Sequence, residues 1–249
     1  MSLDVKYFRI ERLIKNGAEC FLCALEDEIE RKYIEAYLSK LVLDAKAGEK
    51  AVETAGFCNH HFYKMLHAAS KQESSYLGIA LIVQNIIKQL IQDLQKRKRQ
   101  CKESIVQIDE EGCPLCVYLD SSMEIYYRKI VDLLISCDEG FLKLFKESKG
   151  LCLPHFIMLL SALEEKAYEH SRDEVVKLIV NVEEKNLSRL NAELSGYVKR
   201  QSYKFSEKDS KALKTTMLRS AQKIVSRRGT KLNNVQAAAL KSNLVTSVK

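Results

Sequence analysis

The stretch GAECFLCALE at residues 17–26 returns as EEGCPLCVYL at residues 110–119, and both copies contain a Cys-x2-Cys pair. A second stretch, AGFCNHHFYKML at residues 55–66, returns as KGLCLPHFIMLL at residues 149–160, and both copies contain a Cys-x2-His pair. The two motifs follow in the same order in each half of the chain, with separations that differ by one residue. Self-similarity of this kind indicates a duplicated structural unit.

Composition predicts that the duplicated unit is helical. The chain has 249 residues, of which 46% are hydrophobic and 29% charged, and these are globular proportions. Only 9 glycines and 2 prolines are present, which is few for the turns of a many-stranded fold. We therefore expect an all-α protein built from a tandem helical repeat.

Each copy predicts about four helices. The first begins at the Cys-x2-Cys pair and ends near residue 42 or 136. A shorter one follows Asp44 or Asp138, which are candidate N-caps, and ends at Gly56 or Gly150. The Cys-x2-His pair begins a third helix, and a long helix closes the copy. The expected organisation is a first repeat at 1–105, a second at 106–200, packed as one fused core, and a basic helical tail at 201–249.

The spacing of the cysteines and histidines suits metal binding. Both prolines, Pro114 and Pro154, lie just after a motif cysteine, where the first turn of a helix tolerates a missing N–H group. Each pair is therefore expected at a helix N-terminus, where residues three apart share one face and the helix dipole favours the thiolate. Two ligands of each pair can then reach the same ion.

Joining a Cys-x2-Cys pair to a Cys-x2-His pair gives a tetrahedral Cys3His set, which is typical of structural zinc. We expect each half to form its own site, so that one ion joins the two ends of a helical hairpin. The chain would then bind two Zn²⁺. The predicted ligands are Cys20, Cys23, Cys58 and His61 in the first half and Cys113, Cys116, Cys152 and His155 in the second.

Other interpretations of these residues stay open. A [2Fe–2S] cluster also accepts histidine in place of cysteine, and buried cysteines with core histidines, or disulfides between the pairs, are further possibilities. His60 aligns with Pro154, Cys137 aligns with an apolar residue, and Cys101 lies outside both copies. These three residues are therefore left out of the predicted sites.

Catalysis is disfavoured. A complete Cys3His set leaves no open coordination position and supplies no nucleophile with a base beside it. The sequence contains no glycine-rich phosphate loop, no G-x-S-x-G and no H-E-x-x-H motif. We therefore predict no catalytic residue and no organic cofactor.

The charge is distributed unevenly. Thirteen Lys and Arg residues stand against two acidic residues from Lys199 to the end, although the whole chain has a net charge of only +7. Such a tail is typical of a nucleic-acid arm, and a terminal helix docked on the body with a solvated basic face is the alternative that we favour. Aromatic residues for base stacking are scarce in the tail.

The N-terminal residues lack the apolar segment of a signal peptide, and the longest apolar stretch, near Ile79, is interrupted by Gln84, Asn85 and Lys88. We therefore expect a cytoplasmic protein without a membrane span. In a reducing compartment, eight cysteines favour metal binding over disulfides.

The motifs ECFLC, GFCNHHF, CPLC and GLCLPHF resemble those of an uncharacterised bacterial family, common in anaerobic Firmicutes, that is classed as a domain of unknown function. The resemblance covers roughly residues 8–225 and implies no activity. From the residues themselves we expect a zinc-binding scaffold for an unknown protein partner. Nucleic-acid binding through the tail and a thiol-based redox or metal sensor are the alternatives.

Overall fold

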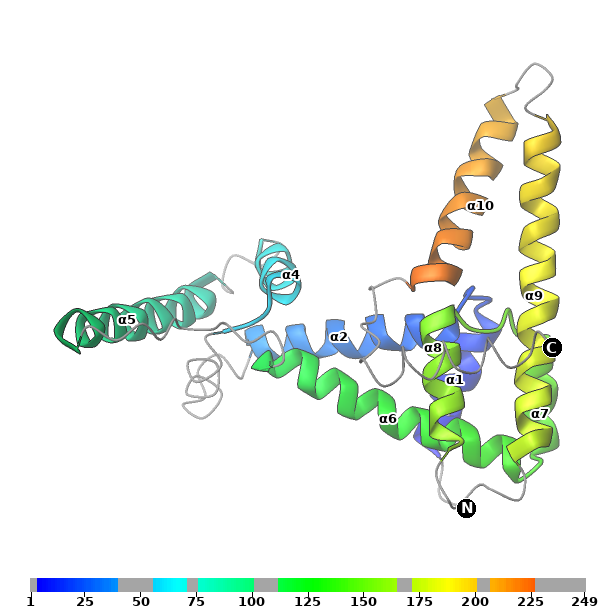
Figure 1. Ribbon diagram of the computed structural model, residues 1–249, viewed down its shortest axis with the longest axis horizontal. Helices are drawn as coiled ribbons and strands as arrows, with labels where there is room; N and C mark the ends of the chain where they lie inside the picture. The colour runs from blue at the N-terminus through cyan, green and yellow to red at the C-terminus, as the bar shows by residue number, and fades with distance from the viewer. Residues whose placement is uncertain are drawn as a thin grey trace. The chain divides into compact units, whose positions relative to one another are not determined.

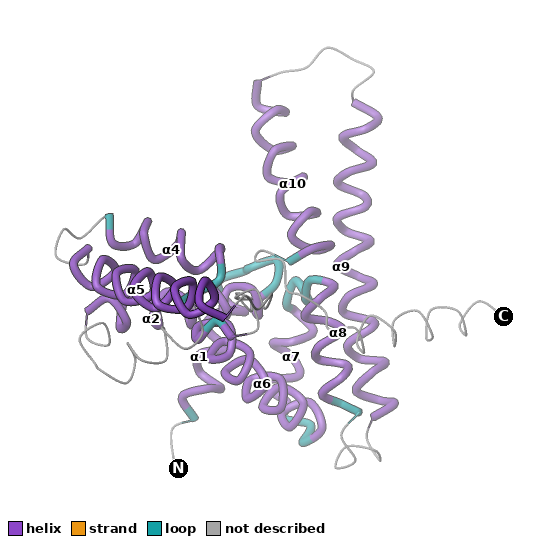
Figure 2. The backbone as a smooth tube through the Cα atoms, turned by 60° about the vertical axis from the view of Figure 1, so that its left-hand side comes forward, coloured by secondary structure: helices purple, strands orange, loops and turns teal. Residues whose placement is uncertain are grey.

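The computed structural model describes residues 4–39, 56–70, 76–100, 112–164, 172–200 and 207–226. Within these ranges the regular structure is helical and no strand occurs (Figure 2). The predicted all-α fold is confirmed. The helices, labelled in Figure 1, are α1 (Val5–Lys15), α2 (Phe21–Ser39), α4 (Asn59–Ala69), α5 (Tyr76–Gln100), α6 (Pro114–Ile135), α7 (Glu139–Glu147), α8 (Leu153–Ala162), α9 (Arg172–Arg200) and α10 (Glu207–Val225).

Local signals in the sequence explain where several helices begin and end. The side chain of Asp138 accepts a hydrogen bond of 2.7 Å from the backbone N–H of Phe141, so Asp138 is the N-cap of α7 as predicted. Its counterpart Asp44 lies outside the described residues. Gly56 and Gly150 have φ angles of +101° and +70°, which is the left-handed conformation expected before each Cys-x2-His motif.

The repeated motifs do not predict helix α1, which precedes the first of them. Asp4 caps it by accepting hydrogen bonds from the backbone N–H groups of Lys6 and Tyr7. Its buried residues are Ile10, Leu13 and Ile14, a spacing that places them on one face of the helix. The helix contacts α7, and the ring of Tyr7 lies 6.2 Å from that of Phe141.

The chain divides into two compact units. Unit 1 comprises Met1–Glu26 and Glu124–Lys249, and unit 2 comprises Asp27–Met123. The boundaries fall inside α2 and α6, so each unit takes chain from both sequence repeats. The predicted boundaries near residues 105 and 200 are therefore not the boundaries of these units.

In unit 1, aromatic and aliphatic side chains form the core. Phe21, Phe141 and Phe145 are almost fully buried, and the rings of Phe21 and Phe145 meet edge to face at 6.3 Å. Burying each side chain of this size contributes roughly 1.5–3 kcal/mol. Helix α10 contacts both α8 and α9, and it runs beside α9 in both views (Figures 1 and 2).

In unit 2, Tyr37 packs edge to face on Phe57 with ring centroids 5.1 Å apart, and Leu119 and Met65 are also buried. Helix α5 contacts α4, but most of its apolar side chains are exposed. Its segment Tyr76–Lys96 is long and apolar enough to cross a membrane by length and composition. The polar residues that interrupt this stretch in the sequence therefore do not shorten the helix below a membrane span.

Candidate metal centres

Four buried ligand residues meet in unit 1, and we name this set cluster I: Cys20, Cys23, Cys152 and His155. The sulfur atoms of Cys20 and Cys23 each lie 3.4 Å from Nδ1 of His155, and that of Cys152 lies 3.1 Å from it. The sulfurs of Cys23 and Cys152 are 3.6 Å apart. One nitrogen and three sulfurs therefore face a common point.

The same arrangement occurs in unit 2, and we name this set cluster II: Cys58, His61, Cys113 and Cys116. Nδ1 of His61 lies 3.2 Å from the sulfurs of Cys58 and Cys113 and 3.3 Å from that of Cys116. The sulfurs of Cys58 and Cys116 are 3.8 Å apart. Cys58 and Cys116 are only partly buried, whereas all four members of cluster I are buried.

The eight predicted ligands are thus gathered into two Cys3His sets, but the pairing differs from the prediction. Each Cys-x2-Cys pair was expected to join the Cys-x2-His pair of its own repeat. Instead, Cys20 and Cys23 meet the second Cys-x2-His pair, and Cys113 and Cys116 meet the first. The expectation that one ion joins the ends of a hairpin within a repeat is corrected accordingly.

Helix starts position all four pairs, as the sequence predicted. Cys58 and Cys152 are the N-caps of α4 and α8, and Cys20 and Cys113 immediately precede α2 and α6. The second ligand follows three residues later, within the first turn. The backbone N–H groups and the partial positive charge at a helix start favour a thiolate at these positions.

Each cluster contains one thiol with a strongly lowered pKa. A hydrogen bond from Cys116 lowers the pKa of Cys113 to about 3, although burial acts in the opposite direction. In cluster I, hydrogen bonding with Cys152 and Cys20 lowers the pKa of Cys23 far below that of an ordinary thiol. Burial raises the pKa of Cys20 well above its ordinary value. In each cluster the neighbouring thiols therefore favour the thiolate at one cysteine, and the thiolate is the form of cysteine that binds metal.

Two glutamates beside the histidines were missed by the sequence analysis. Oε2 of Glu26 lies 3.5 Å from Nε2 of His155, and Oε1 of Glu30 lies 3.1 Å from Nε2 of His61. Both carboxylates come from α2 and are buried. Their sequence signal is weak, because they stand among other charged residues of a helix and resemble its solvent-facing positions.

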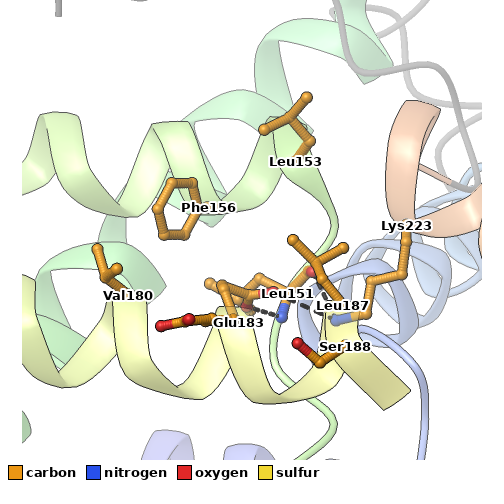
Figure 3. A pocket seen from close by; sticks show the side chains of 9 residues that line it. Leu151, Leu153, Phe156, Val180, Glu183, Leu187, Ser188 and Lys223 are labelled. Carbon is orange, nitrogen blue, oxygen red and sulfur yellow. Dashed lines mark hydrogen bonds and ion pairs between the residues drawn. The ribbon is translucent and has the colours of Figure 1, made fainter. Parts of the chain in front are cut away.

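Helix α10 contacts the chain just before two ligands of cluster I (Figure 3). The ammonium group of Lys223 donates hydrogen bonds of 2.5 Å and 2.7 Å to the backbone carbonyls of Lys149 and Leu151, and lies 3.4 Å from Glu183. Glu183 also accepts a hydrogen bond from the backbone N–H of Leu151. Lys223 is almost fully buried. This segment leads directly into Cys152.

A second contact of α10 lies beside the other ligand pair of cluster I. Arg219 is 3.2 Å from Glu19, the residue before Cys20, and 2.5 Å from Glu193 of α9. Arg189 of α9 also pairs with Glu19, at 2.6 Å. The favoured expectation for the start of the basic tail, a docked helix, agrees with these contacts, but its basic side chains are not all solvated, because Lys223 is buried against unit 1.

Of the three residues left out of the predicted sites, the two that the structure describes belong to neither Cys3His set. Cys137 is exposed, and Cys101 lies outside the described residues. His60 is 45% exposed at its side chain and lies 3.3 Å from Glu30, so it borders cluster II without joining its four members.

The arrangement is compatible with metal binding and does not match disulfides. A disulfide requires sulfur atoms about 2.05 Å apart, whereas the sulfur pairs given above are 3.6 Å and 3.8 Å apart. All seven cysteines in the described part of the chain are free. In each cluster the four ligand atoms lie within 4.8 Å of one another, so one ion can contact all four.

Comparison with known proteins adds a family but no activity. The model of a family of unknown function, DUF6062, matches residues 1–231. No curated protein and no solved structure matches the chain.

Proposed function

The chain belongs to this family of unknown function, and we propose that it is a non-catalytic scaffold in which clusters I and II each bind one structural Zn²⁺. The donor chemistry supports this assignment. Three thiolate sulfurs and one imidazole nitrogen form a closed four-ligand set, and zinc accepts such a set without any preference from d electrons. When bound, the ion would cross-link two helix starts that are far apart in the sequence.

The observation that carries the proposal is the spacing of the ligand atoms. Bond lengths of about 2.3 Å to sulfur and about 2.0–2.1 Å to nitrogen give a tetrahedron with edges of about 3.8 Å between sulfurs and about 3.6 Å between sulfur and nitrogen. The sulfur pairs are 3.6 Å and 3.8 Å apart, and the sulfur-to-nitrogen distances are 3.1–3.4 Å. A [2Fe–2S] cluster divides its four ligands between two irons, so one shared point fits a single ion better.

Elemental analysis of the purified full chain, together with its visible absorption spectrum, tests the proposal. We expect two zinc ions per chain and no visible absorption. The double variant Cys23→Ser/Cys152→Ser should retain one ion, as should Cys58→Ser/Cys116→Ser, while Cys137→Ser retains two. Iron with visible absorption, or zinc content that the cluster variants leave unchanged, would refute it.

We also propose that the scaffold contacts a protein partner through α5, in the cytoplasm. The support is the exposed apolar surface of this helix, to which Leu77, Ile87, Ile91 and Leu94 contribute side chains that are 48–67% exposed. A patch of this kind on one helix is typical of an interaction site. A photo-crosslinker at Leu77 should capture one defined protein, and the capture should fail with Ile87→Ser/Ile91→Ser but persist with Gln92→Ser. Equal capture by both variants would refute the role of α5.

A redox or metal sensor is a second candidate, and the partial exposure of Cys58 and Cys116 favours it. Oxidation of these thiolates would remove two ligands from cluster II and release its ion. Low doses of peroxide should then release about one zinc per chain, and a thiol reductant with added zinc should restore it. Zinc retained until the protein is grossly oxidised would exclude this function.

Nucleic-acid binding through the tail is the third candidate. Arg219 and Lys223 already pair with carboxylates of unit 1, so phosphate contacts would depend on other cations of the tail. A gel-shift titration at several salt concentrations tests it, because phosphate contacts weaken steeply with salt. Lack of binding at low salt would exclude it.

A further inference from the structure

Each candidate centre has a buried carboxylate at the outer nitrogen of its histidine. Glu26 and Glu30 are only 5% and 2% exposed, and His155 and His61 are fully buried. Removing a carboxylate from water is costly unless a partner compensates for it. The two glutamates lie on the same helix, α2, which has ample solvent-facing positions for acidic residues.

The orientation of the imidazole rings gives these carboxylates a specific partner. In both clusters Nδ1 faces the three sulfurs, at 3.1–3.4 Å, and Nε2 faces the glutamate. A histidine that binds a metal through Nδ1 must hold its proton on Nε2. The carboxylate oxygen, 3.1 Å from Nε2 for Glu30 and 3.5 Å for Glu26, faces that proton and favours it on Nε2 electrostatically, which selects the tautomer and the orientation of the ring.

We propose that Glu26 and Glu30 are positioning residues that hold His155 and His61 in the tautomer and orientation required for metal binding through Nδ1. This inference rests on the proposed function. The carboxylates also make Nδ1 of each imidazole a stronger electron-pair donor to the metal. Loss of such a partner typically weakens metal affinity about 10–100-fold.

The surroundings of the two carboxylates differ. Glu30 also pairs with Lys64 at 2.5 Å and with His60 at 3.3 Å, so its charge is shared among several groups. Tyr127 lies near Glu26 and His155, with its ring 6.3 Å from the imidazole. Because Lys64 and His60 offset part of the charge that Glu30 presents to His61, we expect the larger effect of substitution at Glu26.

The test measures zinc affinity in the full chain by competition with a chromophoric chelator. Glu26→Gln preserves the shape of the side chain and removes its charge. We expect it to weaken zinc binding about 10–100-fold at cluster I alone, with two ions still bound at saturating zinc. Glu30→Gln should weaken cluster II alone. Glu35→Gln, at a position of α2 that is 54% exposed, is the matched control and should change neither site.

A double-mutant cycle separates positioning from a general structural role. His155→Cys replaces the imidazole by a thiolate that has no outer nitrogen to orient. If Glu26 acts through His155, Glu26→Gln should have no further effect on zinc affinity in this background. An equal loss of affinity in both backgrounds would overturn the inference, as would unchanged affinity in Glu26→Gln alone.

Nuclear magnetic resonance of the imidazole nitrogens reports which nitrogen carries the proton, and a general loss of stability would not change this tautomer. Zinc-loaded wild type should show the proton on Nε2 of both histidines, and Glu26→Gln should shift the signal of His155 only. If wild type binds no metal, the proposed function itself fails. Two bound zinc ions with both signals unchanged in the variants would refute only the positioning role.

Discussion

Clusters I and II contain the same four ligand types at helix starts, yet their surroundings differ. Cluster I is buried at all four residues, and α10 contacts the chain just before two of its cysteines. Cluster II leaves Cys58 and Cys116 partly exposed, and its glutamate is shared with Lys64 and His60. The difference shows that the same set of residue types can form a buried cluster and a partly exposed one, because the packing around the cluster determines how far solvent reaches it.

The largest expected effect tests which motifs share an ion. Cys20→Ser/Cys152→Ser alters cluster I twice and should cost one zinc per chain. Cys20→Ser/Cys58→Ser alters both clusters and should cost both ions, together with much of the stability, since structural zinc in peptides contributes roughly 10–16 kcal/mol. If each repeat formed its own site, Cys20→Ser/Cys152→Ser would lose both ions and Cys20→Ser/Cys58→Ser only one. Metal content and thermal unfolding measure the outcome.

Replacing the buried lysine of α10 should weaken unit 1 selectively. Lys223→Met leaves Glu183 buried without its cation and two carbonyls without their donor, which should cost about 3–5 kcal/mol. Urea unfolding of the zinc-loaded protein measures this, with exposed Lys146→Met as the control. The same variant should accelerate zinc release from cluster I and leave cluster II unchanged. Equal acceleration at both clusters would contradict the special role of α10.

Replacing Gly150, two residues before Cys152, should cost more stability than replacing Gly17, a glycine of equal backbone conformation elsewhere in unit 1. Gly150 and Gly17 both have φ of +70°, but a Cβ atom on Gly150 would lie 2.5 Å from Oε1 of Glu183, whereas one on Gly17 meets nothing within 4 Å. Gly17→Ala should cost about 1–2 kcal/mol from backbone strain alone. Gly150→Ala should exceed it by about 1–3 kcal/mol in urea unfolding, and equal costs would mean that Glu183 moves freely.

A chelator should empty the two clusters in a fixed order. Because Cys58 and Cys116 of cluster II are only partly buried, its ion should leave about tenfold faster, equivalent to an opening free energy smaller by about 1.4 kcal/mol. Stopped-flow release into a chromophoric chelator gives both rates. Proteins with one cluster removed by serine substitution assign each phase. A single phase in wild type would remove the proposed difference in access.

The smallest effect concerns acid stability in unit 1. Burial acts to raise the pKa of Glu193, but hydrogen bonds from Arg219 and Arg189 hold it below the ordinary value of 4.5. Since the folded state lowers this pKa, the pair stabilises the protein above about pH 4.5, and the contribution disappears as pH falls through the folded value. Arg219→Gln should therefore flatten the loss of stability in acid. Arg128→Gln, from an exposed pair with Glu124, should follow wild type.

The sequence was sufficient to predict most of the described helices, although not α1, and the eight residues that form the two Cys3His sets, because duplicated motifs restrict both at once. It could not decide the pairing. Each Cys-x2-Cys pair is chemically able to join either Cys-x2-His pair, so only the tertiary fold separates the two arrangements. Glu26 and Glu30 were also beyond reach, since a buried carboxylate and a solvated one look alike in a charged helix. The docking of Lys223 needed the positions of the carbonyls of Lys149 and Leu151.

The pairing of motifs from different repeats, with cluster II nested inside cluster I along the chain, also constrains the order of folding during synthesis. Cys23 and Cys152 are 129 residues apart, and Cys58 and Cys116 are 58 residues apart and lie within that span. The longer loop costs only about 0.7 kcal/mol more closure entropy than the shorter one. On a ribosome, however, the inner loop is complete before the chain that contains Cys152 has been made. The four residues of cluster II can therefore come together first. Those of cluster I can come together only after the segment that contains Cys152 and His155 has been made.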